Sequence, residues 1–217
     1  MRGERRFPFI AIEGTDGSGK STLRDVLNRE LARQGHTCFM VGQHSWLDVG
    51  AGRVVLAARN QRLGHSREEL TRAYALDKFL HLRENIEPAL ATAGVLADRF
   101  VHSDAVYHDV LYGIPAERTL ARHRELGTRL PDLVLFVDTD PDIAYQRVLR
   151  RNKASRPHET RETLRALREK YLAVLGRERG PVLRVDNSGP AVERTAATVL
   201  TQVLPLFRRP EEVRRLA

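Results

Sequence analysis

One glycine-rich stretch near the N-terminus constrains the fold of this chain more than any other feature. The apolar run Phe9–Ile12 leads into Gly14–Ser21, which fits the pattern G-x-x-x-x-G-K-[ST] without a mismatch. Such a loop follows a buried strand and lets successive backbone N–H groups surround a phosphate. Apolar residues at helical spacing follow between Leu23 and Leu31, so a helix N-terminus can complete the anion site. The sequence therefore predicts a nucleoside triphosphate site between a first strand and a first helix, Lys20–Gln34.

The polar positions of this loop have predicted tasks. Lys20 would place a positive charge at the β- and γ-phosphates, and the Ser21 hydroxyl would ligate Mg²⁺. The candidate nucleotide-binding residues are Gly14, Asp16, Gly17, Ser18, Gly19, Lys20, Ser21 and Thr22. Ser21 is also the candidate metal ligand.

Length and composition limit the remaining classes of protein. The chain has 217 residues, which is enough for one α/β domain with a complete core and short for two. No apolar run is long enough for a membrane span, and the N-terminus lacks the apolar core of a signal peptide. Cys38 is the only cysteine, so neither an intrachain disulfide nor a cysteine-based zinc site is expected. These features fit a cytoplasmic protein.

Short apolar runs alternate with helical patterns along the whole chain. The predicted strands are Phe7–Ile12, Thr37–Val41, Gly94–Ala97, Asp132–Val137 and Pro181–Val185. The predicted helices between and after them are a short one at Arg53–Asn60, a long one from Ser66 to about Ile86, and further ones at Ser103–Leu111, Ala116–Leu126, from Pro141, from Thr160, and at Ala191–Leu206. The alternation predicts a P-loop NTPase fold, in which helices cover both faces of a five-stranded parallel sheet. We expect a single domain over residues 1–217, with a frayed basic tail at about 207–217.

The ends of the predicted strands indicate where ligands bind. In such folds ligands sit at the carboxyl ends of the strands, here Gly14–Ser21, Gly42–Asp48, Asp98–Arg99 and Asp138–Asp140. A GTPase switch would carry an N/T-K-x-D guanine motif after a strand, which this chain lacks. The size is typical of kinases that act on small metabolites.

Five segments resemble motifs of the thymidylate kinase family, in the order that the family has them. They are Glu13–Thr22 (E-G-x-D-G-x-G-K-[ST]-T), Tyr74–His81 (F-A-A-D-R-x-x-H), Ile86–Leu90 (I-x-P-A-L), Ala97–Tyr107 (D-R-Y-x-x-S-x-x-A-Y) and Pro131–Asp138 (P-D-L-x-x-x-L-D). The resemblance implies transfer of a phosphoryl group from Mg·ATP to a nucleoside monophosphate such as dTMP. It also implies a small-molecule acceptor and a homodimer.

The resemblance assigns catalytic roles to several charged residues. Arg99 would clamp the phosphate of the acceptor, and Asp98 would orient Arg99 or the water shell of the metal. The basic stretch at about 147–158 matches the lid of the family. Because the P-loop holds no arginine, the transition-state arginine would come from the lid, with Arg151 and Arg156 as candidates. The expected catalytic residues are Lys20, Asp98, Arg99, Arg151 and Arg156.

The resemblance also implies which residues bind the acceptor. Asp16 would face the 3′-hydroxyl of the sugar, Tyr74 would stack on the base, Lys78 would contact the base edge, and Tyr107 would lie against the sugar. The expected acceptor-binding residues are Asp16, Tyr74, Lys78, Arg99, Asp104 and Tyr107. Purely structural roles remain open for them, such as a turn for Asp16, core packing for both tyrosines, or a surface ion pair for Arg99.

The chain departs from the family pattern where the acceptor should bind. The family has R-E-P-G-G-T after the second strand, whereas Gly42–Gly52 contains neither a proline nor an arginine. Lys78 stands where the family has an arginine, and a lysine cannot make a bidentate fork. Asp104 stands where the family reads the base with an amide, and an ionised aspartate only accepts hydrogen bonds. An acceptor-only group would favour an amino-bearing base over thymine.

These departures leave two alternatives to a dTMP kinase. One is a nucleoside or small-metabolite kinase with a changed acceptor. The other is an ATP-binding regulatory or nucleic-acid-associated protein without kinase turnover, for which the formal charge of +8 is weak support. We expect no nucleic-acid partner, and the sequence does not distinguish ATP from GTP as the donor.

Overall fold

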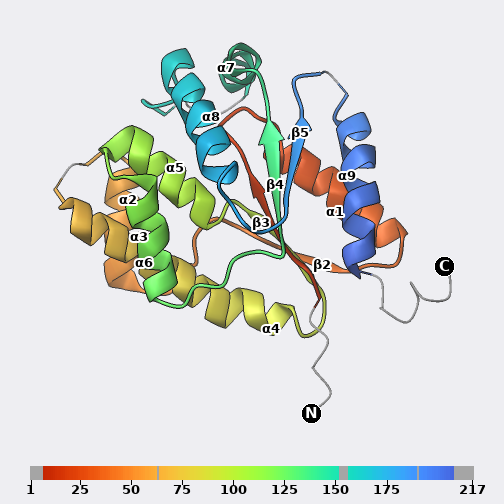
Figure 1. The fold of residues 1–217 in the computed structure, drawn as a ribbon, viewed down its shortest axis with the longest axis horizontal. Helices are drawn as coiled ribbons and strands as arrows, with labels where there is room; N and C mark the ends of the chain where they lie inside the picture. Colours follow the sequence, from red (N-terminus) through yellow and green to blue (C-terminus); the bar gives the residue numbers. More distant parts are fainter. Residues whose placement is uncertain (1–6, 63, 152–155, 190, 208–217) are drawn as a thin grey trace.

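A parallel sheet of five strands forms the centre of the molecule (Figure 1). The computed structural model describes residues 7–62, 64–151, 156–189 and 191–207. The strands are β1 (Phe9–Glu13), β2 (Cys38–Val41), β3 (Gly94–Asp98), β4 (Leu133–Asp138) and β5 (Val182–Asp186), in the spatial order β2-β3-β1-β4-β5. Each lies within two residues of its predicted position. The predicted α/β fold with a five-stranded parallel sheet is confirmed.

The central strand β1 is the most deeply buried of the five. It pairs with β3 on one side and β4 on the other, so that Ile10 lies opposite both Leu96 and Leu133. All five residues of β1 are buried. A parallel strand that is covered on both faces has no solvent side, so β1 is a continuous apolar run up to its last residue, Glu13.

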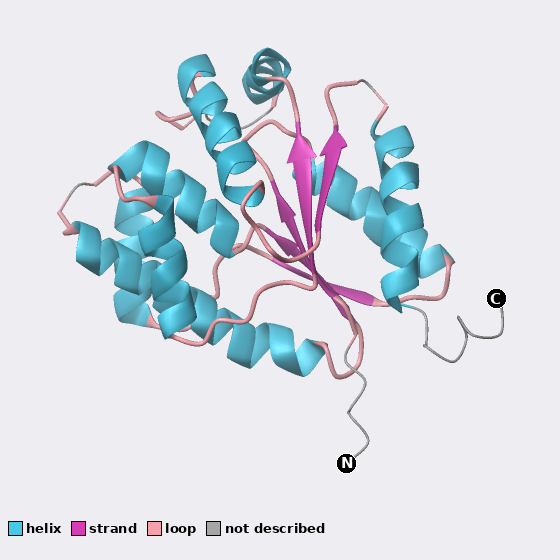
Figure 2. Ribbon diagram, in the orientation of Figure 1, coloured by secondary structure: helices cyan, strands magenta, loops and turns pink. Residues whose placement is uncertain are grey.

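Helices cover both faces of the sheet (Figures 1 and 2). They are α1 (Lys20–Arg33), α2 (Val49–Arg59), α3 (Arg67–His81), α4 (Glu87–Ala89), α5 (Val101–Tyr112), α6 (Ala116–Glu125), α7 (Pro141–Arg150), α8 (Arg161–Leu175) and α9 (Val192–Phe207). On one face α1 and α9 pack against β1, β3 and β4. On the other face α5, α7 and α8 pack against β4, and α2 and α3 form a smaller apolar cluster with Ile114. None of the described helices is long and apolar enough to cross a membrane.

Two helices differ from their predicted bounds for local reasons. The helix predicted at Arg53–Asn60 begins earlier, at Val49, because the Asp48 side chain accepts a hydrogen bond from the Ala51 N–H at 2.7 Å and caps it. The long helix predicted to continue to about Ile86 leaves α-helical geometry after His81 and forms a π-helical segment, Leu82–Ile86. There the Glu87 N–H donates to the carbonyl of Leu82, just before Pro88 removes the next backbone donor.

The predicted lid and tail fall partly outside the described residues. Helix α7 ends at Arg150, and α8 begins at Arg161. Of the lid at about 147–158, residues 152–155 lie outside the described part. All of the tail after Phe207 lies outside it as well.

Candidate active site

The P-loop connects β1 to α1, and its backbone turns so tightly that it needs glycine at Gly17 and Gly19, among other positions. Gly17 has a φ of +77°, and a Cβ there would lie 2.1 Å from the carbonyl oxygen of Ala144. Gly19, with a φ of +85°, is the residue before α1, and a Cβ there would lie 2.5 Å from the Asn187 side chain. Any larger residue would collide with α7 or with the loop after β5. The loop therefore has the close backbone approach that a phosphate cradle requires.

Hydrogen bonds from the ends of β4 and β5 hold the P-loop in place. Thr139 Oγ1 and Asn187 Nδ2 both donate to the carbonyl of Ser18, at 3.1 and 2.7 Å. Arg147 in turn donates to the carbonyls of Asn187 and Gly189, at 2.8 and 2.9 Å. The Arg147 side chain thus supports the loop after β5, which in turn holds the P-loop through Asn187.

The Lys20 ammonium lies within the P-loop itself. Its Nζ donates to the Thr15 carbonyl at 2.6 Å and to Ser18 Oγ at 3.5 Å. Burial, together with the nearby charge of Arg99, lowers the pKa of Lys20 to about 8. A phosphate anion beside Lys20 would favour its charged form.

Ser21 and Asp98 bring two hard oxygen ligands together. The Ser21 hydroxyl donates to Asp98 Oδ2 at 3.0 Å, and the Arg24 guanidinium lies 3.3 Å from the same oxygen. Ser21 is at the start of α1, and Asp98 is the last residue of β3. A hydroxyl and a carboxylate beside a phosphate cradle suit Mg²⁺, so these two residues fit the metal that the sequence predicts.

Arg99 is the centre of a hydrogen-bond network. Its Nη2 donates to Asp16 Oδ1 at 3.1 Å and to the Tyr107 hydroxyl at 2.8 Å. Its Nη1 donates to the Ser103 and Tyr171 hydroxyls at 3.2 and 3.0 Å. Although burial alone would raise the pKa of Asp16, the charges of Arg99 and Lys20 and the hydrogen bonds from His158 and Tyr107 together hold that pKa well below its usual range.

The backbone and a buried carboxylate fix Arg99 in this position. Arg99 has a φ of +73°, a left-handed conformation that costs a non-glycine residue on the order of 1 kcal/mol. Behind it, the fully buried Glu13 accepts hydrogen bonds from the Phe100 N–H at 2.9 Å and from the Ser103 hydroxyl. The Tyr171 hydroxyl, from α8, lies 2.6 Å from Ser103 Oγ. The network therefore joins β1, α5 and α8 at the end of β3.

Two cavities meet at this network. The first, here called the P-loop cavity, is lined by Asp16, Gly17, Gly19, Lys20, Ser21 and Thr22, by Asp98 and Arg99, and by Arg147, Arg151 and Arg156, among others. Gly14 and Ser18 do not line it. The second, here called the aromatic cavity, is lined by Tyr74, Tyr107, His108, Leu111 and Tyr112, among others, and also by Asp16, Arg99, Asp104 and Arg156. The structure thus brings together most of the site residues that the sequence predicts.

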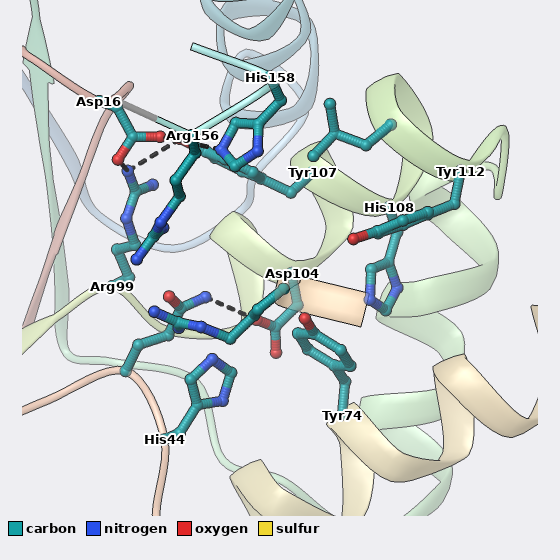
Figure 3. Close-up of a pocket in the computed structure, with 13 residues that line it drawn as sticks. Asp16, His44, Tyr74, Arg99, Asp104, Tyr107, His108, Tyr112, Arg156 and His158 are labelled. Carbon is teal, nitrogen blue, oxygen red and sulfur yellow. Dashed lines mark hydrogen bonds and ion pairs between the residues drawn. The ribbon is translucent and has the colours of Figure 1, made fainter. Parts of the chain in front are cut away.

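The aromatic cavity has a charged end and an aromatic end. In Figure 3, Asp16, Arg99 and Arg156 gather on one side, and Tyr74, His108 and Tyr112 gather on the other. The Tyr74 ring lies edge-on to His108, with 4.5 Å between the ring centroids. Burial lowers the pKa of His108 to about 4, so this histidine is neutral at pH 7. A ligand with an anionic group at one end and a flat ring at the other matches this arrangement.

Asp77 fixes the loop that follows β2 and forms one wall of this cavity. Its Oδ1 accepts from the N–H and hydroxyl of Ser45, at 3.0 and 2.8 Å, and from the Trp46 N–H at 3.1 Å. Its Oδ2 lies 3.0 Å from His44 Nδ1. Burial lowers the pKa of His44 to about 4, so the neutral ring donates from Nδ1 and keeps Nε2 free as an acceptor. These four contacts hold the loop after β2 against α3.

The structure places Lys78 behind Asp104 and away from the cavity surface. The Lys78 side chain is fully buried and does not line either of the two cavities. Its Nζ lies 3.2 Å from Asp104 Oδ2, and His123 Nε2 lies 3.5 Å from the same oxygen. Although burial alone would raise the pKa of Asp104, Lys78 together with His123 and His44 holds it below its usual range, so Asp104 is ionised. On the cavity side, Asp104 Oδ1 accepts from Gln43 Nε2 at 3.2 Å.

The described lid residues differ in how freely they could reach a ligand. Arg151 forms an ion pair with Glu159, and Glu159 also accepts from the Arg156 N–H at 2.7 Å. The Arg156 guanidinium has no ion pair with any described residue and lines both cavities. Of the two predicted lid arginines, Arg156 is therefore the one that is free to bind an anion in this conformation.

Sequence reasoning missed three residues that line both cavities, namely Gln43, His44 and Arg59. Arg59 is the last residue of α2, and Gln43 is the second residue after β2. The position of Gln43, just past a strand end, is a signal that could have indicated its role. No sequence signal distinguishes Arg59 from the exposed arginines of the chain.

A second group of possible metal ligands lies beside the first. Ligand atoms of Asp16, His158 and Glu159 lie within 4.8 Å of one another. Both carboxylates already pair with guanidinium groups, Asp16 with Arg99 and Glu159 with Arg151.

Comparison with known proteins agrees with this geometry. The family model described as "Thymidylate kinase" matches residues 12–198. The thymidylate kinase of Leptospira interrogans (strain Fiocruz L1-130) is 30% identical over 199 residues, which cover 90% of this chain and 95% of the relative. The thymidylate kinase of Desulfosudis oleivorans is 31% identical over 213 residues, covering 93% of this chain and 100% of the relative. A probable thymidylate kinase of Archaeoglobus fulgidus is 32% identical over 165 residues, covering 76% of this chain and 80% of the relative. The chain belongs to the thymidylate kinase family.

Proposed function

We propose that this protein transfers the γ-phosphate of Mg·ATP to dTMP or a closely related nucleoside monophosphate, releasing ADP and the diphosphate. The observation that carries the proposal is the junction of the two cavities. A phosphate cradle with Lys20 opens directly into an aromatic cavity whose near end holds Asp16, Arg99 and Arg156. The names of the relatives support the same activity and do not favour the two alternative functions considered above.

The residues of the P-loop cavity would hold the donor. Bound Mg·ATP would supply the phosphoryl group, and its Mg²⁺ would neutralise part of the charge of the phosphates. The P-loop N–H groups and Lys20 would hold the β- and γ-phosphates, and Ser21 and Asp98 would hold the metal. Arg156, and Arg151 once it leaves Glu159, would neutralise the charge that develops on the transferred group.

The residues of the aromatic cavity would hold the acceptor. Tyr74 would stack on the base, Tyr107 would lie against the sugar, and Asp16 would face the 3′-hydroxyl. Arg99 positions Asp16 and Tyr107 through the hydrogen bonds it donates to both. This placement would align the acceptor phosphate with the P-loop, which is the main task in phosphoryl transfer.

The contacts of Asp104 bear on which base binds. Its two carboxylate oxygens face Gln43 on one side and Lys78 on the other. We therefore propose that Asp104 orients the Gln43 amide, which can both donate to and accept from a base. An amide of this kind is compatible with thymine, whereas a free carboxylate would favour an amino-bearing base. Lys78 would act through Asp104 without touching the base.

The test is ADP release with Mg·ATP in the presence of dTMP, dUMP, dCMP, UMP, CMP, the matching nucleosides, or no acceptor. We expect turnover with dTMP well above the rate without acceptor. Turnover with a nucleoside alone would support the small-metabolite alternative. ATP binding without turnover on any acceptor would support the regulatory alternative. Repeating the panel with Asp104→Asn tests the orienting role of Asp104: an unchanged acceptor preference would mean that Asp104 has no part in selecting the base.

We further propose that the protein is a cytoplasmic homodimer without a nucleic-acid partner. An apolar surface hollow between α2, α3 and α6, which Val54, Leu76 and Leu126 line, supports a protein contact on that side. Light scattering of the purified protein measures the assembly state directly, and a monomeric mass would refute the dimer.

A further inference from the structure

The phosphate of an acceptor must lie where the two cavities overlap, because only there can it face a γ-phosphate held by the P-loop. Among the described residues, those that line both cavities are Asp16, Gln43, His44, Arg59, Arg99 and Arg156. Since the pKa of His44 is about 4, these six side chains carry a formal charge of +2, from three arginines and one aspartate. A phosphate monoester carries about −1.5 to −2 at pH 7, so it would balance this charge.

Arg99 already uses its terminal nitrogens on protein groups. Both Nη atoms donate to side-chain oxygens, namely those of Ser103 and Tyr171 from Nη1 and those of Asp16 and Tyr107 from Nη2. To bind a phosphate through these atoms, Arg99 would have to give up bonds that hold the site together. Arg99, which the sequence predicts to clamp the phosphate, is therefore not sufficient for that role, and another residue can bind the phosphate.

Arg59 differs from Arg99 in that its guanidinium is not engaged by other described residues. It is partly buried, yet within the described part of the chain its guanidinium has no hydrogen bond and no ion pair. Burial and the positive charge of Arg156 lower the pKa of Arg59, and both arginines line the two cavities. A half-buried guanidinium without a partner is costly unless an anion completes its site.

The end of α2 is fixed, so Arg59 is presented from a rigid element. The Tyr112 hydroxyl, from α5, donates to the carbonyl of Ala58 at 3.1 Å. Val55 and Ala58 pack with Tyr74 in the apolar cluster between α2 and α3. The loop Gly42–Gly52, which lies on the same side of the site, has no arginine that could compete for the role.

We propose that Arg59 is a phosphate-binding residue for the acceptor, reaching the junction of the two cavities from the C-terminal end of α2 and sharing the phosphate with Arg156. This inference rests on the proposed function. It adds a specificity-determining residue that selects phosphorylated acceptors over free nucleosides.

The experiment compares Arg59→Gln with Arg53→Gln. Arg53 is a matched control, because it lies on the same helix, loses the same charge, is exposed and lines neither the P-loop cavity nor the aromatic cavity. Calorimetry would measure binding of dTMP and of thymidine to the full-length protein, and steady-state kinetics would measure KM for dTMP and for Mg·ATP.

We expect Arg59→Gln to weaken dTMP binding by about 10- to 100-fold, the size of one hydrogen bond to a charged group. Thymidine binding should change less than about 2-fold, because thymidine has no phosphate. KM for dTMP should rise by a similar factor as the dissociation constant, whereas KM for Mg·ATP should stay near the wild-type value. Arg59→Lys, which keeps the charge without the fork, should fall between the wild type and Arg59→Gln.

Two outcomes would overturn the inference while leaving the proposed function intact. One is an Arg59→Gln protein that binds dTMP as tightly as Arg53→Gln does. The other is an equal loss of dTMP and thymidine binding, which would mean that Arg59 supports the cavity without contacting the phosphate. A wild-type protein that binds none of the monophosphates in the activity panel would overturn both the inference and the proposed function.

Discussion

Removing the charge of Lys78 should destabilise this protein far more than removing a charge at its surface. Lys78 Nζ lies 3.2 Å from Asp104 Oδ2 and 3.6 Å from Asp77 Oδ2, and the Lys78 side chain is fully buried. Lys78→Met would leave the carboxylate of Asp104 in the core without its cation. Breaking a buried ion pair in this way costs about 3–5 kcal/mol. In a chain of 217 residues that loss lowers Tm by about 6–20 °C.

The surroundings of the pair make the two single substitutions unequal. After Asp104→Asn, Lys78 keeps a second carboxylate, Asp77, within ion-pair distance. After Lys78→Met, the only described side chain within ion-pair distance of Asp104 that can carry a positive charge is His123. We therefore expect Asp104→Asn to cost less than Lys78→Met. The double substitution, which removes both charges, should be more stable than Lys78→Met alone.

The pH dependence of the Lys78→Met deficit follows from the sign of the pKa shift. In the wild type the folded-state pKa of Asp104 is depressed, so the pair contributes fully above the unfolded pKa of about 4 and is lost as pH falls below it. Without Lys78, burial raises the pKa of Asp104 instead. The deficit of the variant should therefore be largest at pH 8 and smaller at pH 5, where Asp104 can take up a proton.

Urea unfolding at pH 8 and pH 5 measures these changes in the free energy of unfolding. It compares the wild type, both single variants and the double variant. A Lys78→Met deficit below about 1 kcal/mol would refute the reasoning, because that is the range of an exposed ion pair. Strict additivity in the double variant would refute it as well, since it would mean that the two side chains do not interact.

The other predictions concern the P-loop, the metal site and the loop after β2. Gly17→Ala should abolish ATP binding and lower the free energy of unfolding. The control is Gly35→Ala, because Gly35 has a similar φ of +80° but nothing within 4 Å of a Cβ, so this substitution should lower the free energy of unfolding by only roughly 1 kcal/mol. Urea unfolding measures the change in stability, and ATP titration measures the loss of binding. Ser21→Ala and Asp98→Asn should each raise the Mg²⁺ concentration for half-maximal activity about 10-fold or more, and an unchanged requirement would place the metal elsewhere. The pKa of Asp77 is about 2 in the folded protein and about 4 in the unfolded chain, so its ionised form contributes on the order of 2 kcal/mol to the free energy of unfolding above pH 4. This contribution should be lost between pH 4 and pH 2, and Asp77→Asn should therefore make acid unfolding in that range less steep.

The fold was predictable from the sequence wherever a local pattern determines the structure. The apolar strands, the P-loop and the first helix all follow from short-range periodicity and glycine placement. The early start of α2 was not expected, because Gly50 and Gly52 lower helix propensity and obscure the cap at Asp48. The π-helical segment Leu82–Ile86 was not expected either, since the same apolar spacing suits a continuous α-helix.

The site was predictable as a set of residues but not as a set of contacts. Spacing put Lys78 on the same helical stripe as Tyr74, yet it could not show that Asp104 and His123, from α5 and α6, enclose the Lys78 ammonium. Likewise, the sequence marks Arg59 as one arginine among many. Its place at the cavity junction depends on how α2 packs against α3 and α5, which no local pattern encodes.

The spatial order of the strands has a consequence for synthesis of the chain. β1 is made first but lies in the middle of the sheet, and its two partners, β3 and β4, begin only at Gly94 and Leu133. At about 5–20 residues per second, a ribosome needs on the order of 10 s between the end of β1 and the start of β4. Both edges of this apolar strand are unpaired until β3 is made, and the edge that pairs with β4 stays unpaired for the whole interval. The nascent chain should therefore depend on shielding of Phe9–Glu13, by the exit tunnel or by a chaperone, more than a protein whose first strand pairs with its second.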